Sequence, residues 1–227
     1  MSKLQGKIYT IGHGNKRFGE LVDILKPYHI RILVDIRSYP GSRRNPHFNR
    51  EALEANLPQV GVSYEWFKGL GGYRKSGLGA ESPHVVLKSQ DFRNYADYML
   101  TKEFQKNIGK VLQLARTCPP PARQCQALAG GSLSPRTPSR SSAEADGLRP
   151  ARQCQAMAGG RGGRGGNTCI MCAETLPFRC HRWFVSDYLV ANHVEVVHII
   201  DIKKAECHKL SRYARIQAGN VFYDMGI

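Results

Sequence analysis

The chain has 227 residues, of which 41% are hydrophobic, and a formal net charge of +15. This length suits one large domain or two small ones, and the hydrophobic content is sufficient for a core. No run approaches the roughly 18 apolar residues of a membrane helix, and residues 1–6 lack the apolar region of a signal peptide. We therefore expect a cytoplasmic protein without a membrane partner, and its charge favours an anionic ligand.

The cysteine pattern and the composition set two further limits. Seven unevenly spaced cysteines favour reduced thiols or a metal site over a disulfide framework. Between 117 and 167, Pro, Arg, Ser, Gly and Ala replace nearly all large apolar residues, and the segment 121–131 recurs at 150–160 with one difference. Such a stretch cannot bury enough surface to offset its ordering entropy. We predict a disordered insert, and the alternative is a nucleic-acid-binding arm at 161–166.

Short apolar runs alternate with helical patterns along the rest of the chain. Strands are predicted at 7–11, 31–36, 62–67, 168–173 and 194–200. Helices are predicted between them, with Asn15, Asn49 and Thr101 as N-caps and Pro58 shortening one helix. The last run, 221–223, is expected to add a short edge strand.

This alternation predicts an α/β fold. We expect a single three-layer, doubly wound domain with a mainly parallel sheet of about five strands. Residues 1–116 and 168–227 would form this domain, with the low-complexity segment 117–167 interrupting it.

Chemically active residues gather where the predicted strands end. His13 follows the first strand, Asp35 closes the second, and Cys172 and Glu174 lie at the end of the fourth. The carboxyl ends of parallel strands meet at one edge of a sheet, where α/β proteins bind their ligands. These four residues are therefore the candidate catalytic groups.

Basic residues at the same edge predict an anion site. The run 180–182 opens a helix, and backbone N–H groups at a helix start attract anions. The candidate anion-binding residues are Arg37, Arg43, Arg44, Asn45, Cys180, His181 and Arg182. A nucleotide or a nucleic acid suits this array. In the structural alternative, Asp35 forms an ion pair with one of the arginines, and Glu174 caps a turn.

A thiol enzyme is the alternative function. A strand that ends in a cysteine and leads through a loop into a helix is similar to the plan of rhodanese-like sulfurtransferases and cysteine phosphatases, in which the helix start lowers the thiol pKa. Cys172 would be the nucleophile, and Arg179 or Arg182 the anion clamp. No Cys-x5-Arg loop is present, because Arg179 follows Cys172 by seven positions. Cys180 lies nearer the helix start, so its thiol is expected to be the more acidic.

Zinc binding is a weaker alternative. Cys169 and Cys172 have the spacing of a ligand pair, and Cys180 and His181 together with Cys207 and His208 could complete four ligands. In a strand, however, side chains three positions apart point to opposite faces. The sequence thus leaves open the cofactor, the oligomeric state, and the choice between an enzyme and a purely nucleic-acid-binding module.

The ordered motifs of the chain resemble those of the family called domain of unknown function 488. They are Thr-Ile-Gly-His at 10–13, Val-Asp-Ile-Arg at 34–37, Ser-Arg-Arg-Asn-Pro-His-Phe-Asn at 42–49, Leu-Gly-Gly at 70–72, Tyr-Ala-Asp-Tyr-Met at 95–99, Met-Cys-Ala-Glu at 171–174, Cys-His-Arg at 180–182 and His-Lys-Leu at 208–210. The resemblance covers nearly the whole chain except the insert. It implies an intracellular prokaryotic α/β domain and names no activity.

Overall fold

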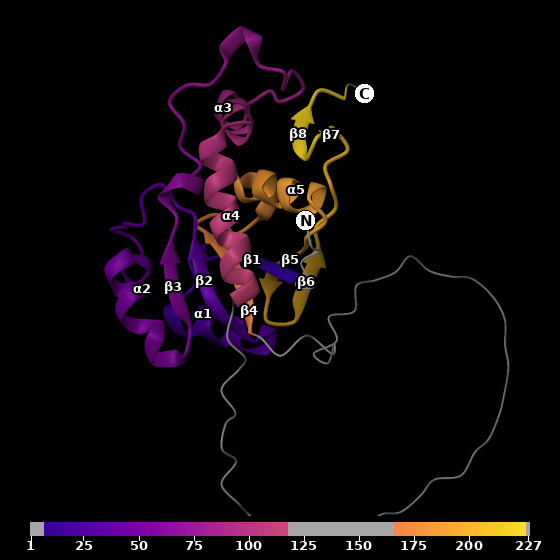
Figure 1. The fold of residues 1–227 in the computed structure, drawn as a ribbon. Helices are drawn as coiled ribbons and strands as arrows, with labels where there is room; N and C mark the ends of the chain where they lie inside the picture. The colour runs from indigo at the N-terminus through magenta and orange to yellow at the C-terminus, as the bar shows by residue number, and fades with distance from the viewer. Residues whose placement is uncertain (1–6, 118–165, 226–227) are drawn as a thin grey trace, which may run out of the picture.

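The computed structural model describes residues 7–117 and 166–225 (Figure 1). Its central sheet has six strands in the order β3-β2-β4-β1-β5-β6. These are β1 (Lys7–Gly12), β2 (Ile30–Asp35), β3 (Ser63–Trp66), β4 (Asn167–Cys172), β5 (Glu195–Asp201) and β6 (Lys204–Cys207). The first five pair in parallel, and β6 runs antiparallel to β5. The predicted α/β fold with a mainly parallel sheet is confirmed.

Helices cover both faces of this sheet. They are α1 (Phe18–Leu25), α2 (Arg50–Asn56), α3 (Gln90–Met99), α4 (Lys102–Thr117) and α5 (Arg182–Ala191). Buried Leu21 and Leu53 place α1 and α2 in one core cluster. Buried Tyr95, Phe104 and Phe184 place α3, α4 and α5 in the other. The two clusters lie on opposite sides of the sheet, which gives the expected three layers (Figure 1).

Strand β4 joins the two described parts of the chain. It follows the gap at 118–165, yet it pairs with β1 on one side and with β2 on the other. Residues on either side of the gap therefore build one sheet. The duplicated segment of the predicted insert lies outside the described residues, so its disorder stays a prediction.

The topological switch point of the sheet lies between β1 and β4. Helix α1 follows β1 on one face, and α5 follows β4 on the other. The two strand ends are held together, since the backbone N–H of His13 donates to the carbonyl of Cys172 at 3.0 Å. Gly12 permits this approach, because a Cβ there would lie 1.8 Å from the carbonyl oxygen of Glu174. Ligands bind at such crevices in open α/β sheets.

The C-terminal region differs from the expectation. The run at 221–223 belongs to β8 (Asn220–Tyr223), which pairs with β7 (Ala214–Gln217) in a separate two-stranded sheet instead of extending the central one. β6 and β7 were not predicted as strands. Half of their side chains are polar, and all but that of Ala214 are exposed or half-buried, so they carry little of the apolar pattern that indicates a strand.

The helix starts agree with the sequence in part. Asn49 and Thr101 directly precede α2 and α4, and the backbone N–H of Phe104 donates to the Thr101 hydroxyl at 3.3 Å. Asn15 is not a cap. Helix α1 is capped at Arg17, whose backbone N–H donates to Glu20 at 2.7 Å, and this carboxylate satisfies a donor that the helix start leaves free.

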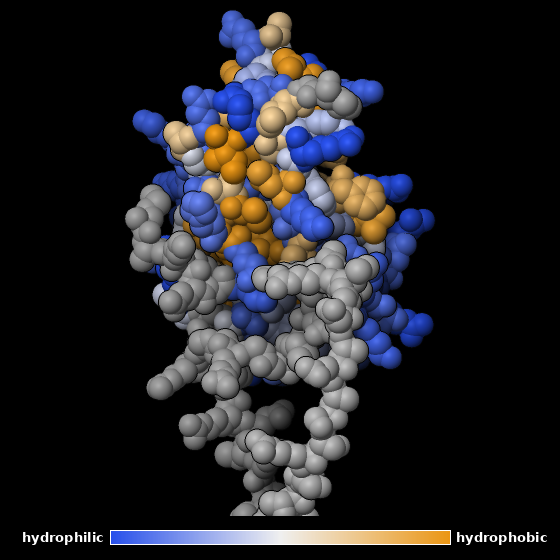
Figure 2. Space-filling model, turned by 90° about the vertical axis from the view of Figure 1, so that its right-hand side faces the viewer, coloured by the Kyte–Doolittle hydropathy of each residue, from blue (hydrophilic) through white to orange (hydrophobic). Residues whose placement is uncertain are grey.

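Two further properties concern the helices and the surface of the molecule. In the described ranges, no helix is long and apolar enough to cross a membrane. On the side of the molecule that lies to the right in Figure 1, apolar side chains gather at the centre of the face, and hydrophilic ones surround them (Figure 2).

Candidate functional site

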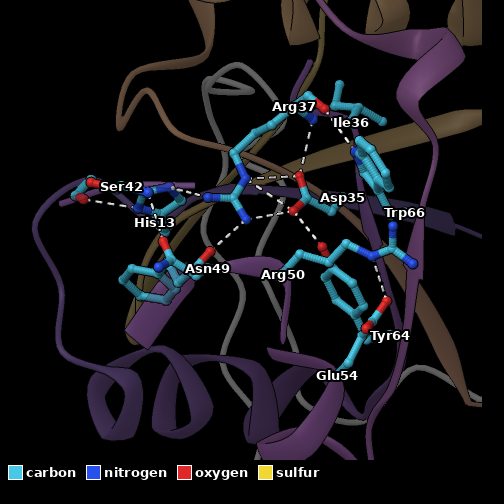
Figure 3. Close-up of polar contacts among 12 residues, drawn as sticks. His13, Asp35, Ile36, Arg37, Ser42, Asn49, Arg50, Glu54, Tyr64 and Trp66 are labelled. Atoms are coloured by element: carbon cyan, nitrogen blue, oxygen red, sulfur yellow. Dashed lines mark hydrogen bonds and ion pairs between the residues drawn. The ribbon is translucent and has the colours of Figure 1, made fainter. Parts of the chain in front are cut away.

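Asp35 and Arg37 form a buried ion pair at the end of β2 (Figure 3). The Nε of Arg37 donates to both carboxylate oxygens at 2.9 Å, and its Nη2 donates to Oδ2 at 2.5 Å. The hydroxyl of Tyr64 also donates to Oδ2, at 2.7 Å, and the indole N–H of Trp66 donates to the Arg37 carbonyl at 2.9 Å. The geometry of Asp35 thus corresponds to the structural alternative of an ion pair within the fold.

His13 is held beside this pair. Its Nδ1 donates to the carbonyl of Gly14 at 2.9 Å, and its Nε2 accepts from Nη1 of Arg37 at 3.3 Å. The ring stacks on Phe48, with 4.3 Å between centroids. Burial and the Arg37 charge lower the pKa of His13 to about 4. The ring is therefore neutral at physiological pH, and both of its nitrogens are engaged.

A second cluster brings two thiols to one imidazole. The Nδ1 of His181 lies 3.9 Å from the sulfur of Cys172, at the end of β4, and 3.6 Å from the sulfur of Cys180, just before α5. The Nε2 of His181 lies 3.1 Å from the carbonyl oxygen of Ile36. A carbonyl oxygen only accepts, so Nε2 carries the proton. In the neutral ring, Nδ1 then presents its lone pair to both thiols.

The two thiols differ in acidity. A hydrogen bond from the Cys180 thiol is the main cause that lowers the pKa of Cys172 well below its ordinary value, and His181 and Arg182 lower it further. The same hydrogen bond, together with burial, raises the pKa of Cys180. This favours a Cys172 thiolate beside a Cys180 thiol. The order is the reverse of the expected one, because Cys180 acts as the donor within the pair.

Arg182 is buried next to these thiols, with only 1% of its surface exposed. Its Nη2 donates to the carbonyls of Glu174 and Thr175 at 3.2 Å each. Its Nε and Nη1 have no hydrogen-bond partner among the described residues, and no carboxylate in those ranges forms an ion pair with it. A buried charge is costly unless an opposite charge compensates it. A thiolate on Cys172 would supply that charge.

The same cluster is a possible metal site. The ligand atoms of Cys172, Cys180 and His181 all lie within 4.8 Å of one another. Three ligands with an open fourth position are typical of catalytic zinc, and a carbonyl partner for the second ring nitrogen is typical of a metal-bound histidine. Cys169 is not part of the cluster, because it lies in the core on the opposite face of the sheet, as strand alternation predicts. His208 belongs to a separate network.

A pocket of about 390 Å³ opens beside the thiols. Cys172, Cys180 and His181 line it, together with Arg37, Arg74, Arg179, Asp91 and Glu174. Its charged lining therefore holds three arginines and two carboxylates, and one of the arginines, Arg37, is already paired with Asp35. Its volume lies in the range of sites for small ligands.

The pocket gathers only part of the predicted site. The side chains of Arg43 and Arg44 are exposed and do not line it. The amide of Asn45 donates to the Gly14 carbonyl at 3.4 Å and fastens its loop to the end of β1. Asp35, His13 and Arg182 are buried and do not line it either.

Tyr39, Tyr73 and Arg74 are among the pocket-lining residues that were not predicted as site residues. Tyr39 follows β2, and the other two follow β3, so all three lie near strand ends. The signal that predicted Cys172, a position after a strand end, also applies to these three residues.

A separate buried network fixes the C-terminal region to α5. The Thr10 hydroxyl lies 2.7 Å from Nδ1 of His198, whose Nε2 lies 2.8 Å from Nδ1 of His208. The Nε2 of His208 lies 2.9 Å from Asp187, which also accepts from the Tyr223 hydroxyl at 2.8 Å. Because the carboxylate only accepts, Nε2 of His208 donates to Asp187. Burial lowers the pKa of His198 to about 3.

Acidification should therefore destabilise the fold. His13 and His198 have pKa values of about 4 and about 3 when folded, below the ordinary 6.5. Between the folded and the unfolded pKa values, the unfolded chain binds more protons than the folded chain. The free energy of unfolding therefore decreases as the pH falls below about 6.5. We expect a loss of about 2 kcal/mol per histidine at about pH 5. Urea unfolding at several pH values measures it, with His198→Gln as the variant whose slope is smaller; a flat profile would contradict the prediction.

A family model described as domain of unknown function DUF488 matches residues 17–119. The matched range includes β2, β3 and the pocket residues Arg37, Tyr39, Tyr73 and Arg74, whereas β4 and α5 follow it. Neither a curated protein nor a solved structure matches the chain. The match confirms the resemblance to the family of domain of unknown function 488 over residues 17–119, whereas the motifs at 10–13, 171–174, 180–182 and 208–210 lie outside the matched range.

Proposed function

We propose that the pocket is the active site of a thiol-dependent enzyme with an anionic substrate, in which Cys172 is the nucleophile and His181 its base. The orientation of the His181 ring carries this proposal. Its Nε2–H is bound by the carbonyl of Ile36, so Nδ1 is directed at the two sulfur atoms. A base held against a thiol by a third group is the arrangement that nucleophilic catalysis requires.

The chemistry follows from these contacts. Nδ1 of His181 accepts the proton of the Cys172 thiol, and the imidazolium keeps its bond to the Ile36 carbonyl. The thiolate is stabilised by the Cys180 S–H and by the buried charge of Arg182. Attack on the substrate forms a bond from its electrophilic atom to the Cys172 sulfur, and the leaving group takes the proton back from His181. A second nucleophile then releases the transferred group.

The charges around the pocket support an anionic substrate. Arg74 is fixed there, since its Nη2 donates to the Gly69 carbonyl at 2.6 Å and its guanidinium lies 3.5 Å from the centre of the Tyr98 ring. Arg37 is already neutralised by its ion pair with Asp35, whereas Arg179 is exposed at the rim and forms no ion pair among the described residues. Fixed guanidinium groups bind carboxylates and phosphates with defined geometry.

A metal at the same three ligands is the competing proposal, and Arg182 argues against it. Its buried positive charge has no carboxylate partner among the described residues. A cation in this position attracts a thiolate and repels a divalent metal ion. The thiol proposal therefore accounts for Arg182, which a Cys172–Cys180–His181 metal site leaves uncompensated.

Alkylation of the full chain with iodoacetamide, resolved by peptide mass spectrometry across a range of pH, tests the proposal. Cys172 should react at neutral pH at least about tenfold faster than Cys169, because only its thiol is ionised and borders the pocket. Cys169 is the internal control, since it is fully buried and burial raises its pKa. Inorganic phosphate should slow the reaction of Cys172. A reaction that begins only after a chelator is added would show a metal site, and a Cys172 as inert as Cys169 under all conditions would exclude thiol chemistry.

A further inference from the structure

We propose that the thiol pocket continues into a groove that binds a single strand of nucleic acid, with Tyr39 and Tyr73 stacking on its bases. This inference rests on the proposed function, because it names the anionic substrate of the same site as a nucleotide within a strand.

The groove consists of two adjoining pockets. The second has a volume of about 380 Å³ and shares Ser38, Tyr39, Tyr73 and Arg74 with the thiol pocket. It extends away from the thiols, and its other lining residues are Lys68, Lys75 and Ser76. Two joined pockets can hold neighbouring units of a chain of repeating units.

Two exposed tyrosines stand where the pockets join. Tyr39 is 70% exposed and Tyr73 is 59% exposed. Their ring centroids are 6.3 Å apart, with the planes inclined by 58°. Neighbouring nucleotides in a strand are spaced by about 3.4 Å, so a base between two rings needs roughly 7 Å. Because both rings are exposed, rotation of their side chains can make them parallel around a base, which is how proteins bind unpaired strands with little sequence preference.

Positive charge follows the groove. Lys68, Arg74 and Lys75 line the second pocket, and no carboxylate among the described residues does so. Both carboxylates, Asp91 and Glu174, lie in the thiol pocket. The second pocket therefore suits the phosphates of a strand, while the reacting group lies near the thiols.

Two observations favour a strand over a free mononucleotide or a duplex. The cations extend beyond the pocket that holds the thiols, and the chain carries 33 Lys and Arg against 18 Asp and Glu, an excess that attracts polyanions. Stacking on exposed rings also requires bases that are not paired, and a duplex hides these faces.

Photocrosslinking to the full chain tests the groove directly. The probe is an oligothymidylate of about ten nucleotides in which one thymine is replaced by 5-iodouracil, a group that crosslinks to nearby aromatic rings. We expect the crosslinks at Tyr39 or Tyr73. Crosslinks confined to other parts of the chain, the Arg-rich residues 118–165 included, would overturn the proposal.

Variants with matched controls measure how much the tyrosines and the lysines of the groove contribute to oligonucleotide binding. Tyr39→Ala with Tyr73→Ala should weaken oligothymidylate binding by roughly tenfold or more, while Ile216→Ala, which removes an exposed side chain from β7, should not. Lys68→Ala with Lys75→Ala should reduce the slope of log affinity against log salt by about 1.4.

The charge control is Lys110→Ala with Lys203→Ala, two exposed lysines that line neither pocket. An equal loss of slope in this control would show diffuse binding over the basic surface and would overturn the groove. Equal affinity for thymidine monophosphate and the oligomer would identify a free nucleotide as the ligand, again against the proposal.

Failure of the groove can be told apart from failure of the thiol enzyme. Oligonucleotide binding is measured on Cys172→Ser, in which no thiol chemistry occurs at this position, and alkylation is measured without oligonucleotide. Binding by Cys172→Ser through the tyrosines, combined with an inert Cys172 in the native chain, would retain the groove and remove the enzyme. Fast alkylation of Cys172 without a crosslink at either tyrosine would retain the enzyme and remove the groove.

Discussion

Replacing His181 with glutamine is expected to slow the alkylation of Cys172 at neutral pH by about one to two orders of magnitude. Glutamine retains a donor for the Ile36 carbonyl but offers no base to the thiol. The pKa of Cys172 should rise towards the ordinary value of a thiol, so the pH at which alkylation becomes fast should also rise. The pH profile of alkylation, followed by peptide mass spectrometry, measures both effects.

A second variant tests the same contact without altering an ionisable group. A Cβ at Gly72 would lie 2.4 Å from Nδ1 of His181, so Gly72→Ala should displace the ring from the thiols and also slow alkylation. Gly19→Ala is the control, because no atom lies within 4 Å of the Cβ it would add. If Gly72→Ala and His181→Gln both react like the native chain, His181 does not activate the thiol.

The second large effect is expected from Asp35→Asn, which should destabilise the fold by about 3–5 kcal/mol. The change leaves the buried guanidinium of Arg37 without its counter-charge, and it weakens the acceptor of the Tyr64 hydroxyl. Urea unfolding measures the loss. Should the variant fail to fold, Asp35→Asn with Arg37→Met removes both charges, and it should recover part of the stability.

The exposed ion pair of Asp23 and Lys26, 3.0 Å apart, provides the control. Asp23→Asn should cost at most about 1 kcal/mol, because solvent screens exposed pairs. A similar small cost for Asp35→Asn would show that the Asp35–Arg37 pair does not hold the end of β2 in place.

The sequence predicts the central sheet well because its strands are continuous apolar runs. The runs 31–36 and 168–173 became β2 and β4 with boundaries shifted by one residue. β6 and β7 have no such signal, because their exposed polar side chains gain nothing from burial. Only the pairing of β6 with β5 makes it a strand.

The expectation that functional residues follow the carboxyl ends of strands places these residues at one edge of the sheet. It does not give the direction of their side chains. It grouped Asp35 and His13 with Cys172, yet both turn towards Arg37. Asp35 forms an ion pair with Arg37, and the neutral His13 ring accepts a hydrogen bond from it. It also made Arg182 an anion clamp, although the first turn of α5 directs that side chain into the core. Single exposed aromatics such as Tyr39 belong to no periodic pattern.

The ionisation of Cys172 is the central claim, and the ultraviolet absorbance of the thiolate measures it directly. The absorbance is followed from about pH 4 to about pH 9 in the native chain and in Cys172→Ser, and the difference isolates this thiol. We predict a difference that is already complete at neutral pH, with a midpoint well below the ordinary thiol pKa of about 8.5. A difference that develops only at about pH 8.5 or above would contradict a thiolate at this site.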